Sequence, residues 1–170
     1  MELKGKRFAV DTGFIVFNDR TYPNFNALLD KIGVQRQKTE MSFSVHNTSN
    51  GLEYNGHSVN TLFAQRRNLL NPRFIKFVTE ILRFNKLAKA AIDQPITAQL
   101  ATLDDFIHYH GFDDYFSVNY ILPMVAAIWS SSIDNSRDFP LRFFLQFFNN
   151  HGLLDITNRP QWYVIKGGSK

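Results

Sequence analysis

Several residue types and patterns are missing from this chain, and each absence narrows its function. The 170 residues include no cysteine, which excludes disulfide bonds and thiolate chemistry and favours a reducing, cytoplasmic location. No uninterrupted apolar run reaches the ~18 residues of a membrane-spanning helix. Residues 1–7 lack the apolar core of a signal peptide. We therefore expect a globular protein of the cytoplasm.

Motifs for the commonest catalytic and nucleotide-binding sites are also lacking. Neither G-x-G-x-x-G nor G-x-x-x-x-G-K-[ST] occurs, so nothing cradles a dinucleotide pyrophosphate in the usual way. The five histidines have no ligand spacing supported by carboxylates, and we expect no metal site. The triplet Ser130, Ser131 and Ser132 lacks the glycines of a nucleophile elbow. The sequence identifies no catalytic residue.

What the chain has in abundance is phenylalanine, with 17 residues. So many rings carry more apolar surface than a domain of this size can easily bury against itself. We expect some of them to face a ligand or another part of a larger protein. The formal charge of +4 is modest and leaves nucleic acid, acidic lipid and plain solubility open.

Periodicity predicts a short sheet region followed by helices. Residues 6–12 and 159–165 read as strands, and residues 43–54 as a hairpin turning at 47–51. The predicted helices are 23–32, 58–70, 72–92, 102–111, 115–129 with a break at Pro123, and 138–151 capped by Asp138. The predicted fold class is α+β, a mainly helical domain with a small antiparallel sheet.

The predicted helix 72–92 has an apolar face and a basic face. The apolar face carries Phe74, Phe77, Val78, Ile81, Leu82, Ala88 and Ile92. The basic side, extended by the preceding helix, carries Arg66, Arg67, Arg73, Lys76, Arg83, Lys86 and Lys89, opposed locally only by Glu80. It is either a solvated face or a peripheral contact with anionic lipid at the inner face of the membrane. Nucleic acid is not expected, because single-strand binders interleave rings with charge.

The segment from Phe139 to Phe148 is apolar around nearly its whole circumference, which predicts a helix covered on two sides. Trp129, Phe143, Phe144 and Phe147 are therefore candidates for lining an apolar substrate site, and ordinary core packing is the alternative. If the segment is an interface, at least two of its Phe rings should be exposed, or covered by self-association with another copy.

Two regions of the chain, residues 8–34 and 122–169, contain short sequence motifs. Residues 8–14, FAVDTGF, are followed by YPNF at 22–25 and KIGV at 31–34. LPMVAAIWS at 122–130, FFNNHGLL at 147–154 and PQWYVIKGGS at 160–169 come later. Together they resemble the FAD-dependent amine oxidase and phytoene desaturase superfamily, in particular bacterial predicted FAD/NAD-binding amine oxidase-like proteins. The resemblance covers residues 5–170.

The resemblance implies that the chain is excised from a larger two-domain oxidoreductase whose main FAD-binding motif lies outside it. Residues 1–57 would form the flavin/substrate-domain junction, 58–157 the helical substrate domain, and 158–170 a strand returning toward the FAD domain. Thr12, Gly13 and Phe14 would contact the flavin, although many amine oxidases have a second glycine where this chain has Phe14. A glycine at a strand end lets backbone approach a flat cofactor, but it also suits a plain turn.

The implied activity is oxidation of an apolar or amine substrate by hydride transfer to FAD, with the isolated chain inactive. The alternative is a stand-alone helical module that binds lipid or a protein partner through its Phe-rich surface without catalysis. Substrate identity and electron acceptor stay open.

Overall fold

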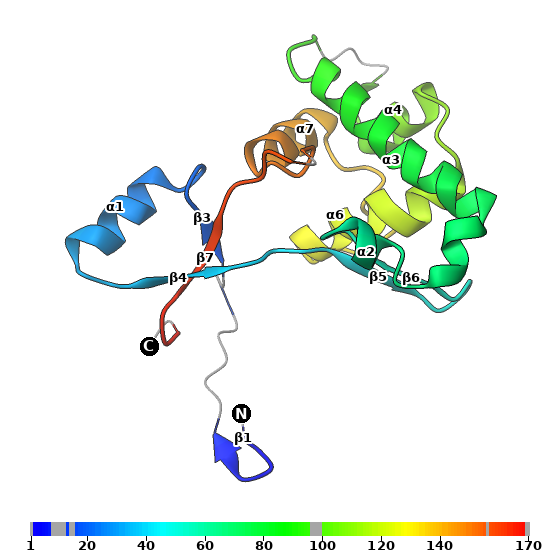
Figure 1. The fold of residues 1–170 in the computed structure, drawn as a ribbon. Helices are drawn as coiled ribbons and strands as arrows, with labels where there is room; N and C mark the ends of the chain where they lie inside the picture. Colours follow the sequence, from blue (N-terminus) through cyan, green and yellow to red (C-terminus); the bar gives the residue numbers. More distant parts are fainter. Residues whose placement is uncertain (1, 8–12, 14–15, 96–99, 156, 169–170) are drawn as a thin grey trace. The chain divides into compact units, whose positions relative to one another are not determined.

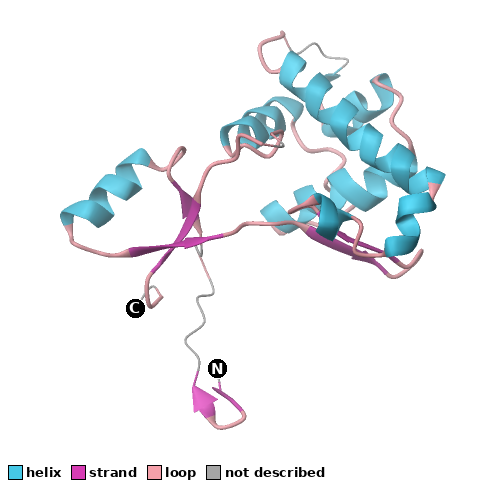
Figure 2. Ribbon diagram, in the orientation of Figure 1, coloured by secondary structure: helices cyan, strands magenta, loops and turns pink. Residues whose placement is uncertain are grey.

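The computed structural model describes residues 2–7, 13, 16–95, 100–155 and 157–168 (Figure 1). The fold is α+β, as the sequence predicts, with helices and three small antiparallel sheets (Figure 2). The chain divides into two compact units. The smaller unit comprises residues 1–41, 150–152 and 156–170, and the larger unit comprises residues 42–149 and 153–155.

The elements of the smaller unit are two hairpin strands, a three-stranded sheet and one helix. They are β1 (Glu2–Leu3), β2 (Lys6–Arg7), β3 (Phe17–Asn18), α1 (Pro23–Lys31), β4 (Arg36–Thr39) and β7 (Trp162–Ile165). Of the predicted strand 6–12, only the start falls on described residues. The predicted strand at 159–165 is confirmed over its second half.

The sheet of the smaller unit has the order β3-β7-β4, with β7 paired antiparallel to both neighbours. Phe17 is buried and packs edge-on to Phe25 of α1, with ring centroids 5.0 Å apart. Asn18 accepts hydrogen bonds from the backbone N–H groups of Arg20 and Thr21 and so fixes the turn into α1. A buried asparagine thus joins the sheet to its helix.

Helix α1 begins at Pro23 and is followed by Gly33, which has a φ of +70°, so the predicted start and stop signals are confirmed. Its apolar face is covered only in part. Leu29 is buried, whereas Leu28 and Ile32 are 49% and 59% exposed. The smaller unit therefore leaves apolar helix surface open to further contacts.

The larger unit contains a hairpin and most of the helices. Its elements are β5 (Ser44–Asn47), β6 (Leu52–Asn55), α2 (Val59–Leu62), the 3₁₀ helix η1 (Arg66–Leu70), α3 (Pro72–Ala91), α4 (Leu103–Tyr109), α5 (Asp114–Phe116), the π-helical segment η3 (Ser117–Ile121), α6 (Leu122–Trp129) and α7 (Leu141–Asn150). The hairpin packs with the helices, so the two compact units divide near residue 41.

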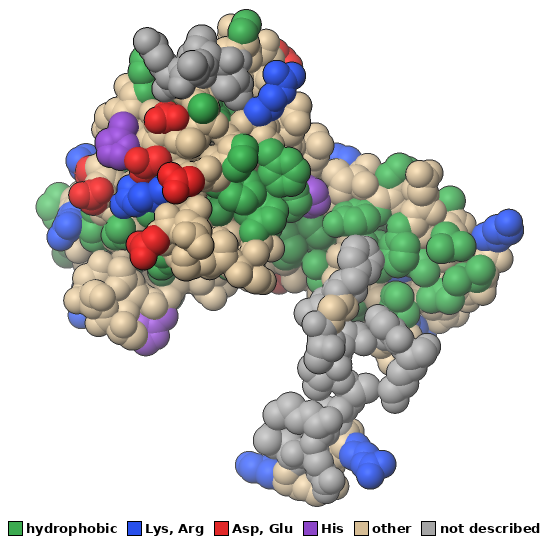
Figure 3. Space-filling model, turned by 180° about the vertical axis from the view of Figure 1, so that it is seen from behind, with side chains coloured by type: hydrophobic (Ala, Val, Ile, Leu, Met, Phe, Trp, Pro, Cys, Tyr) green, Lys and Arg blue, Asp and Glu red, His purple; other side chains and the backbone are tan. Residues whose placement is uncertain are grey.

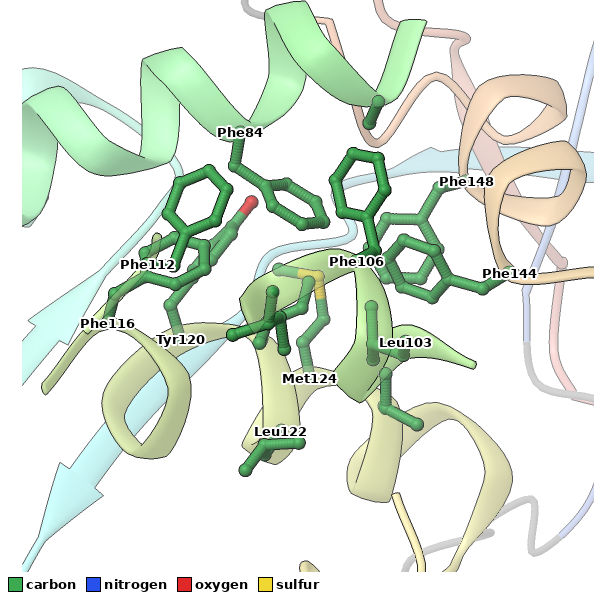
Figure 4. Close-up of a cluster of buried hydrophobic side chains, with 14 of the residues drawn as sticks. Phe84, Leu103, Phe106, Phe112, Phe116, Tyr120, Leu122, Met124, Phe144 and Phe148 are labelled. Carbon is green, nitrogen blue, oxygen red and sulfur yellow. The ribbon is translucent and has the colours of Figure 1, made fainter. Parts of the chain in front are cut away.

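Phenylalanine rings form the core of the larger unit (Figure 4). Phe84 of α3 is fully buried, and its ring contacts the rings of Phe106, Phe112, Phe116 and Phe144 at centroid distances of 5.4–6.0 Å. These four rings come from α4, the loop after it, α5 and α7. One side chain therefore holds four segments together, although the predicted apolar face of α3 omitted Phe84 and wrongly included Leu82, which is 46% exposed.

The predicted break in helix 115–129 is confirmed, and it takes the form of a π-helical segment before Pro123. Asn119 in this segment is fully buried. Its side-chain oxygen accepts hydrogen bonds from Asn47 and Asn50 at 2.8 and 3.2 Å, and its backbone oxygen accepts one from the Tyr54 hydroxyl at 2.7 Å. The hairpin is thereby anchored to the helical core, a link that the sequence did not indicate.

Most predicted helix caps are confirmed. Asn71 caps α3, and Thr102 forms a capping box with Asp105 at the start of α4. Ser58 also forms a capping box, but its helix ends at Leu62 instead of continuing to residue 70.

The predicted start of the last helix at Asp138 is wrong. The backbone oxygen of Phe139 accepts a hydrogen bond from the Leu103 N–H, and the Leu141 N–H donates to Ala101. These bonds keep the segment extended, so that α7 begins only at Leu141.

Phe84 and Phe143 should respond very differently to truncation. Phe84→Ala removes a ring with four aromatic neighbours and should lower the free energy of unfolding by ~3–5 kcal/mol. Phe143→Ala removes a ring that is 52% exposed and should lower it by less than ~1 kcal/mol. Urea titrations followed by circular dichroism measure both values, and similar losses in the two variants would contradict the described core.

Candidate functional site

Four aromatic side chains gather at the surface of the larger unit, where α6 ends and α7 begins. We call this group the aromatic cluster: Trp129, Phe139, Phe143 and Phe147. The indole of Trp129 lies 4.3 Å from the Phe139 ring, 5.9 Å from Phe143 and 4.8 Å from Phe147, measured between centroids. Two of the predicted substrate-binding phenylalanines thus lie beside Trp129, and Phe139 joins them.

Side-chain and backbone hydrogen bonds fix the two segments that present the aromatic cluster. Ser130 ends α6 in the left-handed conformation, with a φ of 51°. The following turn is held by Ser136, whose hydroxyl is hydrogen-bonded to the Ser132 carbonyl and to the Ser131 hydroxyl. The serine triplet therefore belongs to a turn. The bridge between Thr102 and Pro140 then holds the chain entering α7.

Exposure separates the aromatic cluster from the core. Phe143 is 52% exposed, and Trp129, Phe139 and Phe147 are half-buried. Phe144, by contrast, is fully buried and packs on Phe148 with a centroid distance of 4.0 Å. Phe144 therefore lies in the core and is not part of this surface.

Helix α7 is amphipathic and not apolar all round, which corrects the sequence interpretation. One side is buried in the core, through Leu141, Phe144, Leu145 and Phe148, while Arg142, Gln146, Asn149 and Asn150 are exposed. Only one of its Phe rings, Phe143, is more than half exposed, where at least two were expected. The exposed apolar surface is thus narrower than predicted. Hydrophobic side chains also gather in contiguous patches on the face seen in Figure 3.

The aromatic cluster is chemically simple. It offers ring faces and edges and contains no carboxylate, imidazole or amine that could act as an acid or base. Such a surface binds apolar groups and excludes water from them. It can position a substrate, but any bond-changing chemistry must come from another group.

The residues expected near a flavin are only partly described. Thr12 and Phe14 lie outside the described residues. Gly13 is exposed, and a Cβ built on it would meet nothing within 4 Å. A flat ring therefore has room to approach this backbone, but within the described part of the chain no glycine-rich turn opens a helix that could hold the phosphates of FAD.

The second glycine site of the resemblance forms a turn. Gly167 and Gly168 have φ values of +87° and +89°, and the Gly168 N–H donates to the Ile165 carbonyl. These conformations favour glycine over any residue with a Cβ. The pair therefore has a backbone reason to be glycine that needs no cofactor.

The basic side of 66–89 is less positive than the sequence suggested, because acidic residues distant in sequence pair with it. Lys76 contacts Asp113 at 2.7 Å, and Lys89 contacts Asp155 at 2.5 Å. The hydrogen bond that Lys76 donates to Asp113 raises the pKa of Lys76 and lowers the pKa of Asp113. Arg83 pairs with Glu80. Three of the seven cations are thus neutralised locally, which leaves less charge for an anionic membrane.

Other chemistry-bearing groups are dispersed. Among the described residues, no three His, Asp or Glu side chains come together as a metal site. The hydroxyl of Tyr54 has its pKa raised, chiefly by burial, and serves to hold Asn119. No helix in the described ranges has both the length and the apolarity to cross a membrane.

Phe143→Ser should weaken binding of an apolar dye such as anilinonaphthalene sulfonate about fivefold, because losing part of a ring contact is worth ~1 kcal/mol. Gln146→Ser, at an exposed position of the same helix, should leave dye binding unchanged. Fluorescence titration measures both. Equal dye binding by the Phe143 variant and the wild-type chain would mean that the aromatic cluster is not a binding surface.

Comparison with known proteins adds no family to these observations. No protein-family model matches the chain, and a search of curated proteins finds no match either. The functional interpretation therefore depends on the sequence strings and on the geometry of the aromatic cluster.

Proposed function

We propose that this chain is the substrate-side part of a flavin-dependent oxidoreductase of the amine oxidase and desaturase type. The aromatic cluster would contact the apolar portion of the substrate. The chain would be one part of a longer protein, whose nucleotide-binding segment supplies the phosphate contacts that these residues lack.

The observation that carries the proposal is the aromatic cluster itself. The larger unit buries seven Phe side chains almost completely, among them Phe84 and Phe148, so it does not lack the means to cover a ring. Phe143 is nevertheless left 52% exposed beside three half-buried rings. Exposed aromatic surface of this kind is typical of a ligand or domain contact.

Two further observations support the proposal. The strings at 8–14, 22–25 and 160–169 resemble the flavin oxidoreductases, and the second and third of these regions belong to the same compact unit. The uncovered Leu28 and Ile32 on α1 leave apolar surface for another domain in the smaller unit.

The residues present suggest separate roles for FAD and for the aromatic cluster. FAD, when bound, would accept the hydride removed from the substrate. The aromatic cluster would bind the apolar portion of the substrate and keep water from it. No residue of the cluster can take up a proton, so any base must come from elsewhere or be unnecessary.

The alternative is a stand-alone module that binds lipid or protein through the same aromatic cluster. The flanking coding sequence distinguishes the two. We expect a strand–G-x-G-x-x-G–helix unit upstream of residue 1, because pyrophosphate affinity comes from the N–H groups of such a turn. We also expect the purified 170-residue chain to carry no stoichiometric flavin, as read from its absorbance near 450 nm. A yellow chain, or flanking sequence without this unit, would contradict the proposal.

Gly13→Val provides a sharper test. A Cβ at residue 13 meets nothing within 4 Å, so the substitution should change the stability of the 170-residue chain by less than ~0.5 kcal/mol. In the longer protein it should lower flavin content or turnover, because the side chain would stand between backbone and ring. Val59→Gly, at a site that is 74% exposed in the larger unit, controls for general handling of variants. Unchanged flavin content and turnover would make Gly13 an ordinary bend.

A further inference from the structure

A cavity of about 230 Å³, open to solvent on one side, lies in the larger unit between the end of α3, helix α4 and helix α7. Its apolar wall is formed by Leu87, Ala91, Leu100, Phe106, Leu141 and Leu145, and its polar groups come from Gln94, Tyr109 and His110. It shares no residue with the aromatic cluster. On α7 the two sites lie on different sides, since Leu141 and Leu145 face the cavity whereas Phe143 and Phe147 belong to the cluster.

This cavity has a buried floor and an exposed rim. Phe106, Leu141 and Leu145 in its floor are buried, whereas Tyr109 at its rim is 69% exposed. An apolar cavity of ~150 Å³ is large enough to bind benzene, so the space beside Ala91 has room for a small aromatic molecule. Small side chains at Ala90 and Ala91 leave this space open where α3 approaches α7.

The polar side of the cavity is uncharged. No Asp, Glu, Lys or Arg is among the described residues that line it. The imidazole of His110 packs against Phe106 and Tyr109, with centroids 4.4 and 5.0 Å away. Burial, and secondarily the charge of Arg83, lowers the pKa of His110, so the ring is neutral at pH 7. A neutral imidazole offers a single donor and a single acceptor.

We propose that this cavity is a binding site for a small uncharged molecule, mainly apolar and about the size of one or two fused rings, that bears one hydrogen-bonding group. The apolar wall would supply the affinity, and His110 would orient the polar group. A charged ligand is disfavoured because nothing lining the cavity would balance its charge. This site is independent of the proposed oxidoreductase function.

The first test uses indole as the probe and thermal unfolding of the 170-residue chain as the readout. At ten times its dissociation constant, a ligand of the folded state should raise Tm by about 3–6 °C for a chain of this size. Ala91→Leu fills the cavity and should abolish the rise. Ala127→Leu places the same side chain at an exposed position of α6 outside the cavity and should preserve it.

Amide chemical shifts locate the probe if Ala91→Leu itself disturbs folding. Indole should shift the resonances of Ala91, Leu100 and His110 and leave those of Trp129 and Phe143 unchanged. Absence of any rise in Tm for the wild-type chain would overturn the proposal. So would an equal rise in Ala91→Leu, or shifts confined to the aromatic cluster.

The second test addresses the ligand class. Phenol and toluene have similar shapes, but only phenol can hydrogen-bond to the imidazole. His110→Leu should weaken phenol binding about threefold to tenfold, as expected for one hydrogen bond, and leave toluene binding unchanged. Equal losses for both probes, or none for either, would overturn the role assigned to His110.

Discussion

The packing of aromatic rings around Phe84 is the interaction on which the larger unit depends. Phe84 stands near the middle of α3, and its four ring neighbours come from residues 106–116 and from α7, both distant from Phe84 in sequence (Figure 4). Edge-on and tilted ring pairs add to the free energy of burial and also restrict how the helices can be oriented. The positions of α4, α5 and α7 around α3 follow from this one contact set.

A second, polar link joins the hairpin to that core. Asn119 satisfies its side-chain oxygen with Asn47 and Asn50, and its side-chain nitrogen donates to Tyr115. It lies in a π-helical segment, where the extra residue in the turn changes which side chains face inward. A buried amide is tolerated here because both its oxygen and its nitrogen have hydrogen-bond partners.

Local signals in the sequence predicted much of the secondary structure. Asn71 and the Thr102–Asp105 pair mark helix starts because their side chains bond to nearby backbone, which is an interaction within a few residues. Contacts between distant segments were not predictable in the same way. The extended segment before α7 is fixed by Ala101 and Leu103, and this long-range pairing displaced the start expected at Asp138.

The candidate site was likewise predictable only in part from the sequence. Phe143 and Phe147 were identified because they are one helical turn apart, but separating them from Phe144 requires knowing which side of α7 meets Phe84. The ion pairs of Lys76 and Lys89 were likewise hidden, since Asp113 and Asp155 lie far along the chain. The cavity beside Ala91 had no sequence signal, because its walls come from segments that are distant in the chain.

The pairing of β4 with β7 has a consequence for the connectivity of the two units. Thr39 at the end of β4 lies opposite Trp162 at the start of β7 in the antiparallel register. The chain between them includes the whole larger unit, so that unit is an insertion into what would otherwise be a tight β-hairpin. A short turn from Thr39 to Trp162 would complete the same hairpin, so the pairing of β4 with β7 does not require the residues of the larger unit.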